Sequence, residues 1–361
     1  MRYLFFILPL LLILVYVFVR MWYILPLNSL VKSIVVAAGV LIFAGAILSV
    51  VFTLDNLPLK LSATIYEITN SWMFILLYLF MIFLLMDILR VGNILPKELL
   101  FNSVKGSLAV LGIVLVVFVY GNICYYHKEA KRFNFATNKK IDKPLKIILI
   151  SDLHLGYHNQ RKTFAEWVNM LNKEKADIIL VAGDIVDIST KPLFEQKVYE
   201  EFHRLNAPVY ACLGNHEYYA NTKSVLEFYK RAGINLLQDT CAEYKNVVIV
   251  GRDDRTNTNR KDLYQITKNT DKEKYHILLD HQPYNLEQAE INKMDFQFSG
   301  HTHYGQVFPI NLIMKTMYEK AYGFLQKGNT KYYISSGLGI WGGKFRIGTK
   351  SEYVVLTIEQ K

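Results

Sequence analysis

Five short segments of the chain hold carboxylate, imidazole or amide side chains of the kinds that bind metal ions. In chain order they read "SDLHLG", "AGDIVD", "GNHEYY", "LDHQP" and "FSGHTHYGQV". Oxygen and imidazole donors without thiolates suit Mn, Fe or Zn. The candidate ligands that the segments supply are Asp152, His154, Asp184, Asn215, His281, His301 and His303.

Each segment taken alone has a structural alternative. Asp184 and Asn215 could cap helices or close turns, and His281, which precedes Gln282 and Pro283, could be an ordinary loop histidine. Five such segments in order are harder to explain without a shared site. Four further acidic residues have no comparable motif, and we expect them at the surface or in support of the ligands: Asp187, Asp253, Asp254 and Asp280.

Each of the five segments follows a short apolar, β-branched run that is typical of a buried strand. Helix-like stretches at Lys162–Glu174 and Thr222–Gly233 alternate with the early runs, which predicts an α/β layered fold. Binding residues in such folds gather beyond the carboxyl ends of the strands, which is where these segments lie. Seven such runs occur after residue 144, and all except the fourth and the last precede one of the five segments: Leu145–Ile150, Asp177–Gly183, Val209–Gly214, Val247–Gly251, His276–Asp280, Phe296–Gly300 and Lys331–Gly337.

The ordered set of motifs resembles the calcineurin-like metallophosphoesterase family over residues 144–361. The segment Tyr333–Thr349 is also similar to the closing segment of the bacterial membrane-associated branch of that family. The resemblance implies a metallophosphatase fold, a double β-sandwich flanked by helices. One departure is Tyr304, where the family commonly has glycine; its phenol could contact substrate, but we expect it to point into the core.

The resemblance also implies two divalent metal ions. Asp152, His154, Asp184 and His303 would hold the first, and Asp184, Asn215, His281 and His301 the second, so that Asp184 bridges them. A metal-bridged hydroxide would then attack a phosphomonoester, phosphodiester or pyrophosphate, since two cations lower the pKa of water between them. His216 would serve as general acid or electrostatic clamp at the leaving group, although a supporting or stacking role is the alternative.

Residues 1–126 differ sharply from the rest of the chain because they consist mainly of long apolar runs. We predict four transmembrane helices there, at residues 3–25, 31–54, 71–90 and 106–125. Trp22, Tyr23, Trp72, Tyr125 and Tyr126 would anchor the helix ends at the interfaces. Helices buried inside a soluble protein are the alternative. The first run lacks a small-residue cleavage site and precedes another apolar run, so we do not expect a cleaved signal peptide.

The net charge of +10 is concentrated in the first 140 residues, which hold 12 basic against five acidic side chains. We interpret residues 127–143 as a basic juxtamembrane linker that lies near anionic headgroups, or is merely solvated, and not as a nucleic-acid patch. With four spans, basic residues favour the side of the linker by seven to five. This margin predicts a cytoplasmic domain at residues 144–361, attached to the inner cell membrane. Three cysteines without metal spacing indicate no disulfide framework.

These features predict a membrane-anchored dimetal phosphohydrolase that acts on a phosphorylated or lipid-linked small molecule among membrane lipids. The alternative is a membrane sensor that binds a ligand on the same fold without hydrolysis. Loss of a candidate ligand would favour the sensor, and none is missing. A transporter is less favoured, because Arg20 and Asp87 lie near helix ends where their side chains can extend to water.

Overall fold

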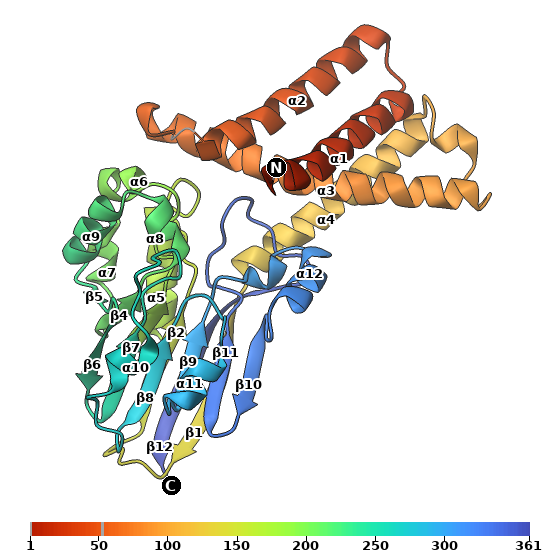
Figure 1. The fold of residues 1–361 in the computed structure, drawn as a ribbon. Helices are drawn as coiled ribbons and strands as arrows, with labels where there is room; N and C mark the ends of the chain where they lie inside the picture. Colours follow the sequence, from red (N-terminus) through yellow and green to blue (C-terminus); the bar gives the residue numbers. More distant parts are fainter. Residues whose placement is uncertain (1, 52–53) are drawn as a thin grey trace. The chain divides into compact units, whose positions relative to one another are not determined.

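The computed structural model describes residues 2–51 and 54–361, with side chains from Leu11 to Ser49 and from Leu54 onward. The chain divides into two compact units. We call residues 1–122 with 342–344 the helical unit, and residues 123–341 with 345–361 the sheet unit. Figure 1 shows the helices of the former and the paired sheets of the latter.

The helical unit contains four long apolar helices, joined by turns that include the short 3-10 helices Leu54–Asn56 and Lys97–Leu99. Val17, Phe18 and Phe83 are among the side chains buried in its core. Arg20 does not extend to water as expected: its guanidinium lies 3.0 Å from Asp87, to which Tyr16 also donates a hydrogen bond. The helices are α1 (Arg2–Ile24), α2 (Ser29–Val51), α3 (Leu59–Val91) and α4 (Val104–Tyr126).

Three of these helices are long and apolar enough to cross a membrane: Ser29–Ser49 within α2, and the whole of α3 and α4. The first expected span is helical, but its part with described side chains, Leu11–Ile24, is shorter than a span. The structure therefore supports three spans among the described residues and not the expected four. The second expected range includes residues 52 and 53, which lie outside the described residues.

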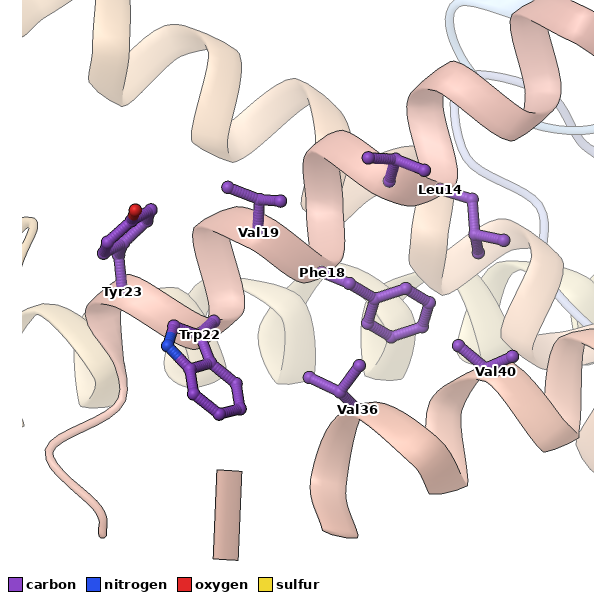
Figure 2. A pocket seen from close by; sticks show the side chains of 8 residues that line it. Leu14, Phe18, Val19, Trp22, Tyr23, Val36 and Val40 are labelled. Atoms are coloured by element: carbon purple, nitrogen blue, oxygen red, sulfur yellow. The ribbon is translucent and has the colours of Figure 1, made fainter. Parts of the chain in front are cut away.

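Helix α3 is longer than expected, because it begins at Leu59 and not near residue 71. Its first turns contain Lys60, Glu67 and Asn70, which lowered the apolar signal there without ending the helix. An apolar groove of about 400 Å³ lies between α1 and α2. Figure 2 shows side chains that line it, among them Phe18, Trp22 and Val36.

The sheet unit is built from two six-stranded sheets (Figure 1). The first has the order β1-β12-β2-β3-β4-β5 and the second β10-β11-β9-β8-β7-β6. The strands of the first sheet are β1 (Lys128–Thr137), β2 (Leu145–Ile150), β3 (Ile178–Ala182), β4 (Val209–Cys212), β5 (Asn235–Leu236) and β12 (Ser351–Gln360). Those of the second are β6 (Thr240–Tyr244), β7 (Val247–Gly251), β8 (Tyr275–Leu279), β9 (Phe296–Ser299), β10 (Gly323–Lys327) and β11 (Thr330–Ile334).

The sheet unit contains three apolar cores, because successive side chains of a strand point to opposite faces of its sheet. In β2, Ile147 and Leu149 point between the sheets, whereas Ile148 and Ile150 face the helices outside. This arrangement confirms the expected α/β metallophosphatase architecture of two sheets flanked by helices. The outer helices are α5 (Arg161–Asn172), α6 (Lys191–Glu195), α7 (Tyr199–Phe202), α8 (Asn215–Tyr219), α9 (Thr222–Arg231), α10 (Leu263–Thr267), α11 (Glu287–Ile291) and α12 (Ile310–Met317).

The segment interpreted as a basic linker is largely a strand. Residues Lys128–Thr137 form β1, which pairs in parallel with β12 at the edge of the first sheet. Phe133 and Phe135 turn inward, and Phe135 packs edge-on against Phe296, while Arg132 is exposed. The basic side chains hid this alternation, because exposed positions of an edge strand tolerate charge.

Candidate metal centre

The candidate ligands lie in loops that leave the carboxyl ends of five strands. Asp152 and His154 follow β2, Asp184 follows β3, and Asn215 opens α8 after β4. His281 follows β8, while His301 and the 3-10 turn His303–Gly305 follow β9. Both sheets therefore contribute side chains to one edge of the sandwich, as the positions of the motifs predict.

Left-handed backbone turns these side chains toward one another. Five of the candidates have positive φ: Asp152 (55°), His154 (44°), Asp184 (53°), His301 (70°) and His303 (46°). Residues other than glycine rarely adopt this conformation, and it concentrates at functional sites. The loops are thus shaped for side-chain convergence at a cost in local backbone energy.

Two glycines of the motifs are required by close approach. A Cβ on Gly300 would lie 2.3 Å from Oδ2 of Asp152, and one on Gly214 would lie 2.2 Å from Oδ1 of Asp184. Both distances are far shorter than a van der Waals contact. The glycines before His301 and Asn215 therefore leave the space that the two carboxylates occupy.

One cluster combines Asp152, His154 and His303, whose donor atoms all lie within 4.8 Å of one another. Nε2 of His154 is 3.1 Å from Nε2 of His303, which is in turn 3.4 Å from Oδ1 of Asp152. Burial, followed by repulsion from His154, holds the pKa of His303 well below its usual range. His303 is therefore neutral and has a lone pair to offer.

A second cluster combines Asp184, His281 and His301, with Asn215 among them. Nε2 of His281 lies 3.1 Å from both Oδ2 of Asp184 and Oδ1 of Asn215. Nδ1 of His301 is 2.8 Å from the same Asn215 oxygen. Burial, then the neighbouring His281, lowers the pKa of His301 to about 4.

Asp184 lies between the two clusters. Its Oδ2 is 3.1 Å from Nε2 of His281 in the second cluster and 3.6 Å from Nε2 of His154 in the first. Burial alone would raise the pKa of Asp184, but attraction to His281 and His216 lowers it well below the ordinary value. An ionised carboxylate at this position can contact cations on both sides.

The donor set fits divalent cations. Nδ1 of His281 lies 2.7 Å from the carbonyl oxygen of Ala182, which can only accept, so Nδ1 donates and Nε2 faces the oxygens of Asp184 and Asn215. Burial would lower the pKa of His281, but Asp184 raises it well above its usual range. These acceptor oxygens therefore favour a positive charge at Nε2, which a proton or a cation can supply. A metal ion that replaced the proton would find Nε2 free to bind it, with the imidazole oriented from behind by the Ala182 carbonyl.

His216 lies at the edge of the first cluster. Its backbone N–H donates to Oδ1 of Asp184, and its ring meets that of His154 edge-on with centroids 4.4 Å apart. Nδ1 lies 3.1 Å from Oδ1 of Asp187. Burial would lower the pKa of His216, but Asp184 and Asp187 raise it to about 9. The side chain is 14% exposed, so the ring can still give a proton to a group outside the protein.

Two acidic residues support the ligands in ways that the sequence indicated only weakly. Oδ1 of Asp187 contacts His154 as well as His216, so of its two expected places, the surface or in support of the ligands, the structure shows the second. Glu217 is fully buried and accepts hydrogen bonds from the backbone N–H groups of Asp184 and Gly214. Two signals in the sequence could have identified them: Asp187 follows Asp184 by three residues, and Glu217 closes the motif "GNHE".

The three other acidic residues without a motif lie outside the metal-type clusters found among the described residues. Asp253, Asp254 and Asp280 are buried and not at the surface. Asp280 pairs with Arg252 and Arg260, while Asp254 accepts from Gln282, next to His281. They form a second layer behind the site.

Arg346 fixes the His303 loop from behind. Its guanidinium is fully buried and donates to the carbonyl oxygens of His303, Ser336, Gly337 and Gly339. Burial lowers its pKa to about 10, so it stays cationic near neutral pH. The tail motif "KFRIG" thus reaches the site through the backbone of His303.

Comparison with known proteins adds the family. A family model described as calcineurin-like phosphoesterase matches residues 145–305. An uncharacterized metallophosphoesterase of Aquifex aeolicus is 30% identical over 261 residues, which cover 69% of this chain and 98% of the relative. A Danio rerio protein described as a transmembrane protein with metallophosphoesterase domain is 26% identical over 349 residues, covering 88% of this chain and 78% of the relative.

An uncharacterized metallophosphoesterase of Campylobacter jejuni is 31% identical over 229 residues, and this chain spans 61% of its length. Residues 145–305, which the family model matches, contain the loops that form both clusters. The candidate membrane spans and the similarity to a transmembrane protein together indicate a membrane protein. The chain therefore belongs to the calcineurin-like phosphoesterase family.

Proposed function

We propose that the chain is a membrane-anchored phosphohydrolase that uses two divalent metal ions to cleave a phosphomonoester, phosphodiester or pyrophosphate. The observation that supports this activity best is the position of Asp184 between two clusters of imidazole and oxygen donors. A single-metal or purely structural site would not need a carboxylate shared in this way.

In this proposal Asp152, His154, Asp184 and His303 hold one metal, and Asp184, Asn215, His281 and His301 hold the other. Two bound cations would lower the pKa of water between them and neutralise phosphoryl oxygens. The protein residues keep the donors fixed: Ala182 orients His281, and Asp187 orients His154. Mn, Fe and Zn all suit this donor set.

His216 is the proposed proton donor to the leaving-group oxygen. Its contact with Asp187 at Nδ1 directs Nε2 away from that carboxylate, and its raised pKa keeps it protonated at neutral pH. A proton delivered to the leaving oxygen removes the need to expel an alkoxide.

The proposed substrate is lipid-linked, and the sheet unit faces the cytoplasm. The candidate spans support the first point, because they hold the site near a bilayer surface. The excess of basic residues near the start of the sheet unit supports the second. A reporter fused to the C-terminus would test the orientation.

Activity is tested with the full chain in detergent, loaded with Mn²⁺ and given bis(4-nitrophenyl) phosphate. We expect metal-dependent turnover, two metal equivalents by mass spectrometry, and loss of most turnover in Asp184→Asn and His216→Ala. His203→Ala is the matched control, since His203 is an exposed histidine on the same unit.

The metal content separates the two candidate residues. Asp184→Asn should lose both metal and turnover, whereas His216→Ala should keep the metals. Absence of metal-dependent turnover from the wild-type chain with metals bound would overturn hydrolysis and favour the sensor.

A further inference from the structure

An exposed apolar surface follows the His301/His303 loop directly. Phe308 and the α12 side chains Leu312, Ile313 and Met317 are 42%, 49%, 54% and 55% exposed. Helical spacing places the three α12 residues on one side of that helix. Large apolar side chains grouped this closely on a soluble surface indicate a partner. We call these four residues the α12 face.

The register of the first sheet shows at which edge of the sheet unit the chain enters from α4. β1 runs parallel to β12, where Lys128 pairs with Ser351, and β12 runs antiparallel to β2. The start of β1 and the end of β2 therefore lie at the same edge of the sheet. That edge holds Asp152 and His154, so the chain enters the sheet unit on the side of the metal-type clusters.

The entry point is fixed to the site loop. The last turn of α4, from Ile123, belongs to the sheet unit. Tyr125 is fully buried there, and its hydroxyl lies 2.5 Å from Oδ1 of Asn159. Asn159 donates in turn to the carbonyl oxygen of Leu153, between Asp152 and His154.

Helix α4 is also a candidate membrane span, and one residue, His127, separates it from β1. A span that ends in the sheet unit leaves no length of chain to carry the site edge away from the bilayer surface. The α12 face lies at this edge, because it follows β9 and the histidine loop. The bilayer is therefore the nearest apolar partner for a face at this edge.

Helix α12 contains one basic side chain and no acidic one, and Glu319, two residues after its end, pairs with Lys327. Lys315 is exposed and lies beside the Tyr304 ring, 5.8 Å from its centroid. A basic group next to apolar side chains is the composition of helices that lie in the interface, with the cation at the phosphate level.

We propose that the α12 face inserts into the lipid–water interface of the membrane that α4 crosses, so that the metal-type site opens onto the headgroups. The partner is a phospholipid bilayer, and α12 lies in its surface without crossing it. The consequence for the substrate rests on the proposed phosphohydrolase function: an amphiphile would present its phosphate from the interface, beside the rim formed by α12.

Insertion is measured by electron spin resonance on the full chain in nanodiscs of phosphatidylcholine and phosphatidylglycerol. A nitroxide is attached at Ile313→Cys or, as control, at Ile291→Cys, in a Cys124→Ser, Cys241→Ser background that keeps the buried Cys212. Ile291 is 68% exposed and lies at the end of α11, before β9 begins and thus near the other edge.

We expect the label at 313 to be reached by oxygen and shielded from a water-soluble nickel chelate, and the label at 291 to show the reverse. Equal access of the nickel chelate to both positions would overturn insertion. Shielding of 313 from both reagents would also overturn it, since this result indicates a protein partner or a second copy of the chain.

A second measurement separates docking from catalysis. The triple variant Leu312→Ser, Ile313→Ser, Met317→Ser is compared with Ile291→Ser on soluble bis(4-nitrophenyl) phosphate and on the 4-nitrophenyl ester of phosphatidic acid in the nanodiscs. We expect unchanged turnover of the soluble ester and roughly tenfold slower turnover of the embedded one, because interfacial binding scales with buried apolar area.

The outcomes distinguish the two proposals. A label at 313 in the interface, without turnover of either ester, would contradict the proposed phosphohydrolase function and support the docking surface. Turnover of both esters with a water-exposed label at 313 would contradict only the docking surface.

Discussion

Oδ1 of Asp187 lies 3.1 Å from Nδ1 of His216 in the interior of the sheet unit, and the same oxygen lies 3.2 Å from Nδ1 of His154. One carboxylate therefore orients a candidate metal ligand and the candidate proton donor together. Its pKa is held far below the usual range, since hydrogen bonds from the two histidines outweigh burial. The charge of Asp187 is thus present at any pH at which the protein works.

Asp187→Asn should slow turnover by about tenfold to a hundredfold, the range for residues that support metal ligands. It should also shift the pH profile. The folded pKa of His216 is raised, so the protonated form is lost as pH rises through about 9. Removing the charge of Asp187 lowers that pKa, and the alkaline fall in kcat should move to lower pH.

The control for this shift is Asp253→Asn, which removes an equally buried carboxylate that accepts from Tyr218. Its alkaline limb should coincide with that of the wild type. If the Asp187→Asn profile also coincided after scaling, Asp187 would not set the protonation of His216.

Glu217→Gln should destabilise the sheet unit by about 2 kcal/mol, because buried backbone donors lose an acceptor oxygen. The two carboxylate oxygens of Glu217 accept from the backbone N–H groups of Asp184, Val186 and Gly214. An amide nitrogen in place of either oxygen faces these donors. Thermal unfolding measures the change, with Glu227→Gln on exposed α9 as a control that should leave stability nearly unchanged.

Tyr304→Gly should leave turnover, substrate preference and stability close to the wild type. Tyr304 has left-handed backbone (φ 49°, ψ 39°) and stacks on Tyr322 with ring centroids 4.8 Å apart. Glycine removes backbone strain of about 1–2 kcal/mol and loses a similar stacking energy. Tyr304→Ala keeps the strain and should be less stable than the glycine variant. A changed substrate preference in either variant would assign the phenol to substrate binding.

Glu174→Gln should reveal an acid-sensitive contact at the edge strand. Hydrogen bonds from Arg132 lower the pKa of Glu174 to about 2, so its stabilising effect is complete above the ordinary glutamate pKa and is lost as pH falls toward about 2. Because Arg132 is more than half exposed, we expect a difference in unfolding free energy of only about 1 kcal/mol at neutral pH. Unfolding curves should converge as the solution is acidified, and a difference independent of pH would contradict this origin.

Much of the site could be predicted from the sequence because four of the seven candidate ligands lie in two short motifs, Asp152 with His154 and His301 with His303. The glycines before His301 and Asn215 mark places where carboxylates approach the backbone, and these motifs are local. The layered fold follows from the alternation of apolar runs, as in β2 and β7. Asp187 and Glu217 act across loops, and only the assembled structure shows what they contact.

The edge strand β1 and the helix α12 were not predicted, for different reasons. β1 contains Lys128, Lys131 and Arg132 and pairs only with a strand far along the chain, so its sequence resembles a basic linker. α12 is short and lies among polar and aromatic residues that interrupt its pattern. Interactions between distant segments decide both elements, and no local window contains them.

The position of β12 between β1 and β2 has a consequence for biosynthesis. The ribosome makes β12 after all the other strands of both sheets, yet β12 is the strand that joins β1 to the rest of its sheet. Until Ser351–Gln360 has been made, the flanks of β1 and β2 that will receive it stay unpaired, close to the end of α4. We therefore expect the sheet to close as a late step of translation, with chaperone dependence greatest just before it.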